Sequence, residues 1–173
     1  MERTRITDTQ SPLYPCFEQL YHMSSPIFEQ RTEQQQHLAF VSQKYHLNIY
    51  TEGEIFIGFI AYWDFDDYLY VEHLAICPDL RGKGYGAAIL KESEKEGKRL
   101  LLEIDPVIDD ISAKRLHFYE LNGFSLNPYP HIHPPYRKGF DAHRLVILTT
   151  RGELTQQEYE RFNADLKDCV MSF

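Results

Sequence analysis

The chain has 173 residues, of which 43% are hydrophobic and 25% are charged, and these proportions are typical of a soluble globular domain. Its 18 Lys and Arg face 26 Asp and Glu, giving a formal net charge of -8, whereas a protein that grips nucleic-acid phosphates is normally basic. The charge therefore argues against nucleic acid as the main partner and favours a cationic small molecule or a basic peptide.

The cysteines and the N-terminal residues bear on the compartment. Cys16, Cys77 and Cys169 are odd in number and widely spaced, which argues against a zinc ribbon or a disulfide framework. Free cysteines are typical of a reducing cytoplasm. The first ten residues lack the apolar segment of a secretory signal, and no apolar run has membrane-spanning length. We expect a cytoplasmic protein with no membrane partner.

The first half of the chain alternates short strands and helices. Thr32 can cap a helix over residues 32–44, and Gln35 completes a capping box. Residues 52–54, with Gly53 at the centre, are typical of a hairpin turn, and residues 63–67 predict a second, acidic turn. The expected elements are a strand at 3–7, helices at 11–22 and 32–44, and strands at 47–51, 55–62 and 68–77.

The second half begins with a glycine-rich turn at 81–86 and a helix that Gly97 ends. The apolar strand expected at 99–104 should run parallel to 68–77, because a helix connects the two. The remaining elements are a helix at 111–121, a strand from 124, a loop at 127–141, a strand at 144–149 and a helix at 154–168. The last helix either covers the sheet or forms a homodimer contact. We expect one α/β (α+β) domain over residues 1–173, with a mixed central sheet of about six to seven strands flanked by helices and a C-terminal helix.

The turn Arg81-Gly82-Lys83-Gly84-Tyr85-Gly86 joins the strand at 68–77 to the helix that continues through Ala87. The first turn of a helix carries unpaired N–H groups and the positive end of the dipole, and glycines allow close approach to that backbone. The segment therefore predicts a phosphate or pyrophosphate site. A nucleotide enzyme is disfavoured, because GxxxxGK[ST] is absent and Ile89 breaks GxGxxG.

Two segments together carry a resemblance to a known family. Arg81-x-x-Gly84-x-Gly86 follows a strand ending in Leu74-Ala75-Ile76, and Phe118-Tyr119-Glu120-Leu121-Asn122-Gly123-Phe124 stands downstream. This pattern resembles the GNAT family of acetyl-CoA-dependent N-acetyltransferases, most strongly over residues 68–124. The resemblance implies the family fold, acetyl-CoA as acyl donor and an amine acceptor, with no metal.

The resemblance also implies roles for individual residues. The backbone of the turn would hold the coenzyme A pyrophosphate, through Arg81, Gly82, Lys83, Gly84, Tyr85, Gly86 and Ala87. Free backbone groups at Leu74, Ala75 and Ile76 would hydrogen-bond the pantetheine arm as an added strand. Tyr119 would protonate the leaving thiolate, although a buried tyrosine that only packs on the sheet is the alternative. Ser112 stands where many members carry an asparagine that contacts the coenzyme.

An amine attacks a thioester only after losing its proton, so a base or a water relay is required. The candidates are Glu72 and His73 on one strand and Glu103 and Asp105 on the next, with Glu72 and Glu103 preferred. By the period of two, Glu72 and Leu74 should share one face, so only one of Glu72 and His73 can face the cleft. Glu103 lies near where some family members place a base. A carboxylate paired with arginine is the alternative for each.

The segment His131 to Arg137 is the most unusual stretch. Two histidines at i and i+2 share a face if extended, so a metal site, an acceptor mouth and a plain loop all remain open. Cys77 is interpreted as a small buried residue, which favours direct transfer over a covalent intermediate. We expect transfer to a primary amine of a small molecule or peptide, such as a polyamine, an aminoglycoside or a peptide amine. The alternative is a non-catalytic acyl-CoA sensor.

Overall fold

An eight-stranded sheet, in the order β1-β2-β3-β4-β5-β8-β6 with β7 paired to β8, forms the centre of the protein. The computed structural model describes residues 1–173. The strands are β1 (Glu2–Ile6), β2 (Tyr45–Glu52), β3 (Ile55–Asp64), β4 (Tyr68–Ile76), β5 (Arg99–Ile104), β6 (Phe124–Leu126), β7 (His131–His133) and β8 (His143–Thr150). The helices are α1 (Tyr14–Ser24), α2 (Glu33–Val41), α3 (Tyr85–Glu94), α4 (Asp110–Leu121) and α5 (Gln156–Asp165), with short turns η1 (Ile27–Glu29), η2 (Pro78–Leu80) and η3 (Leu166–Val170).

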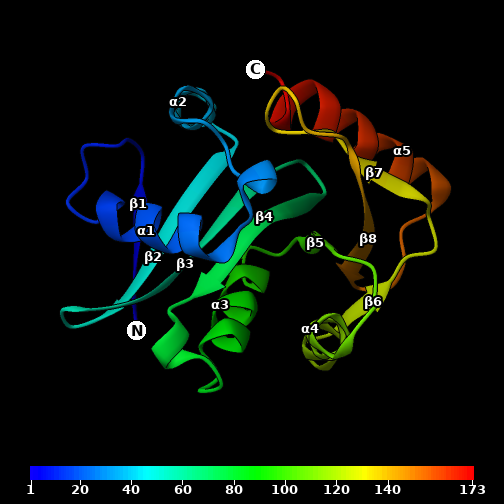
Figure 1. The fold of residues 1–173 in the computed structure, drawn as a ribbon. Helices are drawn as coiled ribbons and strands as arrows, with labels where there is room; N and C mark the ends of the chain where they lie inside the picture. The colour runs from blue at the N-terminus through cyan, green and yellow to red at the C-terminus, as the bar shows by residue number, and fades with distance from the viewer.

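The helices form two layers on the sheet (Figure 1). Residues of α1, α2 and α5, including Phe17, Ala39 and Phe162, share one buried cluster with the sheet. Residues of α3 and α4 pack into a second cluster on the other face, around Ile89 and Leu100. The central strands are apolar along their length because both faces are covered. The terminal helix therefore covers the sheet, and a homodimer contact stays a prediction.

Local signals placed several boundaries correctly. Thr32 and Gln35 form the expected capping box of α2, and Gly53 turns the β2–β3 hairpin with φ of +58°. The prediction of a turn at 63–67 was wrong in its first half. Trp63 and Asp64 belong to β3, where Trp63 pairs with Tyr45 on one side and Tyr70 on the other. Pairing on both sides of β3 overrides the local acidic composition.

The segment 127–141 was expected to be a loop, and this was wrong for β7. His131, Ile132 and His133 pair with β8 at Leu145, Arg144 and His143. The strand is only three residues long and proline flanks it, so no local pattern marks it. This strand completes the eight where about six to seven were expected.

β4 and β5 diverge, and this divergence positions the site. They pair in parallel, as expected, from Tyr68–Arg99 to Val71–Leu102. β5 then continues against β8 as far as Ile104, while β4 continues against β3 as far as Ile76. A gap consequently opens between the ends of the two central strands. No helix is long and apolar enough to cross a membrane.

Candidate active site

The glycine turn leads directly into the start of α3. Gly82 and Gly84 have φ of +75° and +86°, a region that favours glycine. Nothing lies within 4 Å of the position of an added Cβ at either residue. Gly84 is also the N-cap and supplies no side-chain cap, so the N–H groups of the first turn of α3 are open to a ligand. The Arg81 Nε donates to the Ile76 carbonyl at 3.1 Å, which ties the turn to the end of β4.

The end of β4 offers an edge to the gap. Leu74, Ala75 and Ile76 pair only with β3, because pairing with β5 stops at Val71. An extended chain can add to such an edge through main-chain hydrogen bonds. Phe118 of α4 lies 3.2 Å from a Cβ built at Gly86, so a side chain there would crowd α4. Turn, strand edge and α3 together suit a ligand with an anionic group and an extended amide-bearing arm.

A β-bulge changes the expected alternation on β4. Ala61 pairs with His73 and Tyr62 pairs with Val71, which leaves Glu72 without an opposite residue. One extra residue in a bulge interrupts the period of two. Glu72 hydrogen-bonds Trp63 while His73 contacts the ring of Tyr21, so both residues lie on the same face. The prediction that only one of them faces the cleft, with Glu72 and Leu74 sharing a face, was wrong.

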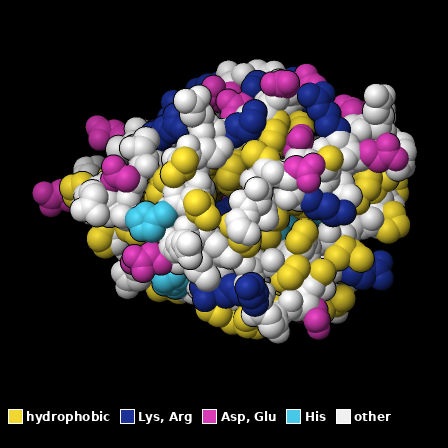
Figure 2. Space-filling view, turned by 90° about the horizontal axis from the view of Figure 1, so that it is seen from above, with side chains coloured by type: hydrophobic (Ala, Val, Ile, Leu, Met, Phe, Trp, Pro, Cys, Tyr) yellow, Lys and Arg dark blue, Asp and Glu magenta, His cyan; other side chains and the backbone are white.

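A cavity of about 290 Å³ occupies the gap between β4 and β5. Its lining combines the three predicted catalytic residues with side chains from distant segments. The charged, histidine and aromatic lining residues are Phe28, Glu29, Tyr70, Glu72, His73, Glu103, Asp105, Arg115, Tyr119, His133, Tyr136 and His143. On the face shown in Figure 2, positive and negative side chains are mixed, with hydrophobic side chains exposed between them. Four carboxylates, those of Glu29, Glu72, Glu103 and Asp105, line the cavity itself.

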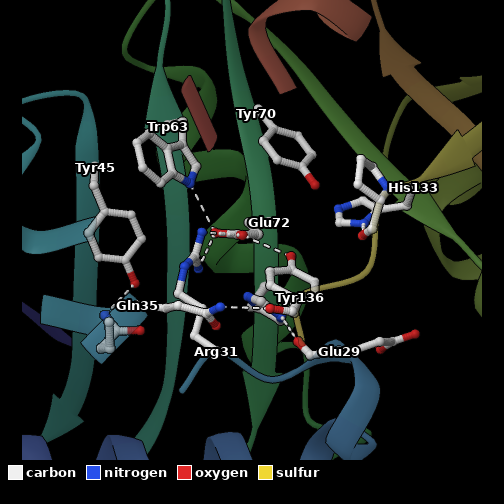
Figure 3. A network of polar contacts seen from close by, with 12 residues as sticks. Glu29, Arg31, Gln35, Tyr45, Trp63, Tyr70, Glu72, His133 and Tyr136 are labelled. Carbon is white, nitrogen blue, oxygen red and sulfur yellow. Dashed lines mark hydrogen bonds and ion pairs between the residues drawn. The ribbon is translucent and has the colours of Figure 1, made fainter. Parts of the chain in front are cut away.

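Glu72 is buried and fully engaged (Figure 3). Arg31 contacts both of its oxygens at 2.6 Å, and the Trp63 indole N–H and Tyr136 hydroxyl donate to it at 2.9 and 2.8 Å. Burial opposes ionisation, but Arg31 prevails and lowers the pKa of Glu72 to about 2. The Arg31 guanidinium also lies 5.6 Å from the ring of Tyr45. Glu72 is thus a carboxylate paired with an arginine, which is the alternative to a catalytic base that the sequence left open.

Glu103 is also engaged at both oxygens, and its side chain is only 5% exposed. The Tyr70 hydroxyl donates to Oε1, and His131 Nε2 donates to Oε2 at 2.5 Å. Burial raises its pKa, but His133 and the hydrogen bonds from His131 and Tyr70 outweigh burial and lower the pKa overall. His133 Nε2 lies 3.8 Å from Oε1. The unusual histidine segment therefore supports Glu103 and lines the cavity. No group of three or more His, Cys, Asp or Glu side chains is arranged so that it could hold a metal ion.

Tyr119 lies on α4 and lines the cavity. Its ring packs against Phe118 and Phe124. Burial raises its pKa to about 12, although the positive charge of Arg115 acts in the opposite direction. The phenol therefore stays protonated at neutral pH, which is the state that a proton donor requires.

Ser112 is part of the N-terminal capping box of α4. Its backbone N–H donates to the Asp109 carboxylate at 2.8 Å, and its hydroxyl accepts from the Asp109 backbone N–H at 3.1 Å. The pair forms a capping box at the first turn. The coenzyme contact predicted for Ser112 stays a prediction.

Sequence reasoning gave no role to Glu29 or Arg31, which the fold brings to the cavity or to its wall, and it considered Tyr136 only as part of the segment from His131 to Arg137. Glu29 ends the short turn η1, which follows the Ser24-Ser25-Pro26 break. Arg137 holds this segment by donating to the carbonyls of Gln30 and Arg31 at 2.9 and 3.1 Å. These contacts span more than a hundred residues, so nothing in the local sequence marks them.

Comparisons with known proteins agree with this geometry. A family model for the acetyltransferase (GNAT) family matches residues 6–124. The Bacillus subtilis (strain 168) protein YjbC, which carries the name of an acetyltransferase, is 33% identical over 79 residues, covering 44% of this chain and only 41% of that protein. A structure from Bacteroides thetaiotaomicron, described as an acetyltransferase of the same family, is 28% identical with a TM-score of 0.90, covering 100% of this chain and 99% of that one.

A more distant structure, a GNAT family acetyltransferase from Elizabethkingia anophelis with acetyl-CoA bound, has a TM-score of 0.56 at 15% identity. The alignment covers 86% of this chain and 97% of that one. At this identity the likeness shows the shared fold alone.

Proposed function

This chain belongs to the GNAT acetyltransferase family, and we propose that it transfers an acetyl group from acetyl-CoA to a primary amine by direct attack. The observation that carries the proposal is one continuous arrangement. An uncapped helix start follows the glycine turn, an unpaired strand edge lies beside it, and the gap next to that edge holds a polar cavity. These features suit a pyrophosphate, a pantetheine arm and a reacting group in that order along one path.

In the proposed complex, the backbone of Arg81 to Ala87 binds the pyrophosphate, and Leu74, Ala75 and Ile76 bind the pantetheine arm. The amine nitrogen attacks the thioester carbonyl, so a C–N bond forms and the C–S bond breaks. Tyr119 gives its proton to the departing sulfur, because it is a protonated phenol in the cavity lining. Tyr70 and Tyr136 also line the cavity, but their hydroxyls already donate to Glu103 and Glu72. Ser112 stabilises the first turn of α4 through the capping box with Asp109. We also propose that Ser112 contacts the coenzyme.

The base roles proposed for Glu72 and Glu103 are weakened by their surroundings. Each carboxylate already accepts hydrogen bonds at both oxygens, and each has a lowered pKa, so neither readily takes a further proton. We assign them positioning roles instead. Glu72 fixes Arg31 and Tyr136, and Glu103 fixes Tyr70 and His131.

Calorimetric titration with acetyl-CoA tests the proposal. Gly84→Glu should weaken binding by about 100-fold or more, since a carboxylate at the helix start repels phosphate, and this corresponds to roughly 2.7 kcal/mol. Gly152→Glu is the matched control, because Gly152 also has positive φ and open space but lies between β8 and α5. Its affinity should equal that of the wild type.

Two outcomes separate the alternatives. Absence of acetyl-CoA binding by the wild-type protein, or equal binding by the Gly84→Glu variant, would refute the proposed donor site. Tight binding without coenzyme A release across a panel of amines would instead favour the non-catalytic sensor.

A further inference from the structure

The carboxylates of the cavity differ in their partners. Glu29, Glu72, Glu103 and Asp105 all line it. Glu72 is paired with Arg31, Glu103 with His131, and Asp105 with Arg115 at 3.3 Å. Glu29 has only His143, whose Nε2 lies 3.8 Å from its Oε1, beyond hydrogen-bond distance. Glu29 is therefore the one cavity carboxylate that accepts no hydrogen bond, since even Asp105, with 53% of its side chain exposed, already accepts one from Arg115.

The backbone that carries Glu29 is held firmly. His73 Nε2 lies 3.3 Å from the Glu29 carbonyl. Arg137 Nε donates to the next carbonyl, that of Gln30, at 2.9 Å. The Arg31 N–H donates to the Tyr21 hydroxyl at 2.8 Å. Arg31 is itself fixed by its ion pair with Glu72 on β4, so the wall that carries Glu29 is fastened to the strand beside the gap (Figure 3).

The charged groups around Glu29 come from four elements and one loop. His143 lies on β8, His73 and Glu103 lie on β4 and β5, Asp105 follows β5, and Arg115 lies on α4. The pKa of Glu29 is raised to about 7, first by partial burial and then by the negative charge of Asp105. Glu103 adds to this rise, and the positive charge of Arg115 opposes it. The side chain of Glu29 is 26% exposed. A base works best when its pKa lies near the working pH, and Glu29 meets this condition.

Apolar side chains stand next to Glu29 at the mouth of the cavity. Phe28 lines the cavity, and its ring lies 6.3 Å from that of Phe140 and 5.7 Å from that of His143. Ile27 is 49% exposed and Phe140 is 39% exposed. One available carboxylate beside exposed apolar side chains suits a ligand with one positive charge on an apolar body.

Building on the proposed function, we propose that Glu29 binds the ammonium group of the acceptor and takes its proton, and that the acceptor is a monocationic amine with an apolar or aromatic body. One proton passes from the ammonium to the Glu29 carboxylate, and the free amine forms the C–N bond. Tyr119 protonates the sulfur, and the second proton lost by the nitrogen restores the Tyr119 phenol. One proton is released to solvent for each acetyl group transferred.

The test uses acetyl-CoA with 2-phenylethylamine, which has one charge and an aromatic body, and with spermine, a polyamine. The wild-type protein should acetylate 2-phenylethylamine with a kcat/KM at least about tenfold above that for spermine. Glu29→Gln should lower kcat/KM by about 10²-fold or more, while the Kd for acetyl-CoA stays within about twofold. Glu33→Gln is the matched control, since that side chain is 86% exposed and contacts only His37, at 3.9 Å.

The pH profile gives a second readout that a structural role would not move. For the wild type, kcat/KM should fall as the pH drops through about 7, because protonated Glu29 cannot accept the proton. That limb should disappear in Glu29→Gln, whereas ionisation of the amine itself affects every variant equally. Glu29→Asp, which keeps the carboxylate, should retain the limb with a smaller loss of activity, and this protects the test against a misfolded glutamine variant.

Four results would overturn part of the account, and they are distinguishable. Activity of Glu29→Gln within about threefold of wild type, with the limb retained, removes Glu29 as the base. A preference for spermine refutes the acceptor class. Binding of acetyl-CoA without acetylation of 2-phenylethylamine also refutes the acceptor class and leaves the donor site intact. Failure of the wild type to bind acetyl-CoA refutes the proposed function itself.

Discussion

The donor side and the acceptor side of the cavity are built in different ways. The donor side consists of one continuous stretch, from the end of β4 through the glycine turn into α3, and it offers mainly backbone groups. The acceptor side is assembled from side chains of η1, β4, β5, β7 and the segment after β7, and it contains buried charges. Open backbone on one side therefore meets a network of paired side chains on the other.

This difference separates what each side contributes. Backbone N–H groups at a helix start recognise any phosphate of suitable shape and need little support from distant residues. A buried ion pair depends on several exact contacts, and removing one partner leaves an uncompensated charge. We expect donor-side substitutions to change acetyl-CoA affinity with little effect on stability, and substitutions in the Arg31–Glu72 pair to do the reverse.

The largest effect is expected at Arg31. Arg31→Met leaves Glu72 buried without its ion partner, which should lower the free energy of unfolding by about 3–5 kcal/mol. Urea denaturation measures the loss. Acetyl-CoA affinity of the folded fraction should change by less than about threefold, because the glycine turn makes no contact with Arg31.

Two further variants sharpen this result. The double variant Arg31→Met/Glu72→Gln should recover most of the stability, because glutamine is neutral and still accepts from Trp63 and Tyr136. Arg161→Met removes an exposed arginine that pairs with Asp66 and Asp67, and it should cost less than about 1 kcal/mol. If Arg31→Met and Arg161→Met were equally mild, the buried pair would not stabilise the acceptor side.

A smaller effect is expected at Tyr119, where the two sides meet. Tyr119→Phe should lower kcat by about 10²-fold, because the sulfur then leaves without a proton donor, while the Kd for acetyl-CoA stays nearly constant. Tyr62→Phe serves as the control, since Tyr62 does not line the cavity and its hydroxyl lies 3.4 Å from Nδ1 of the His46 ring. Parallel losses of turnover and affinity in Tyr119→Phe would assign that residue a structural role.

The smallest effect concerns the pH dependence of stability. The pKa of Glu72 falls from an ordinary 4.5 to about 2, so its stabilisation is present above pH 4.5 and is lost as the pH falls through 2. The pKa of His73 is lowered from 6.5 to about 4, so His73 also makes the protein less stable as the pH falls, but over this higher range of pH. The pKa of Glu29 is raised from 4.5 to about 7, so Glu29 makes the protein more stable as the pH falls through that range. Below pH 4 the carboxylates with lowered pKa, Glu72 together with Glu103, should therefore make stability fall as the pH falls.

Urea midpoints at about pH 4 and about pH 2.5 test this prediction. The wild-type midpoint should fall between these two values of pH, and the fall should be smaller in Arg31→Met/Glu72→Gln. Identical falls in both proteins would show that Glu72 keeps an ordinary pKa.

The same contrast explains how far the sequence could be interpreted. The glycine turn, the parallel β4–β5 pair and the α2 capping box depend on residues close together in the chain, so local rules predicted them. The β4 bulge at Glu72, the strand β7 and the Arg31–Glu72 pair depend on contacts between distant segments. Glu29 was missed for the same reason, because a glutamate after a proline break has no signal until the fold brings it to the cavity.

A crystal structure of the protein with coenzyme A tests the central claim most directly. We predict the pyrophosphate at the backbone N–H groups of Gly82 to Gly86, the pantetheine arm along Leu74 to Ile76, and the sulfur within hydrogen-bond reach of the Tyr119 hydroxyl. Coenzyme A bound outside the gap between β4 and β5, or with its sulfur directed away from the cavity that holds Glu29, would contradict the account.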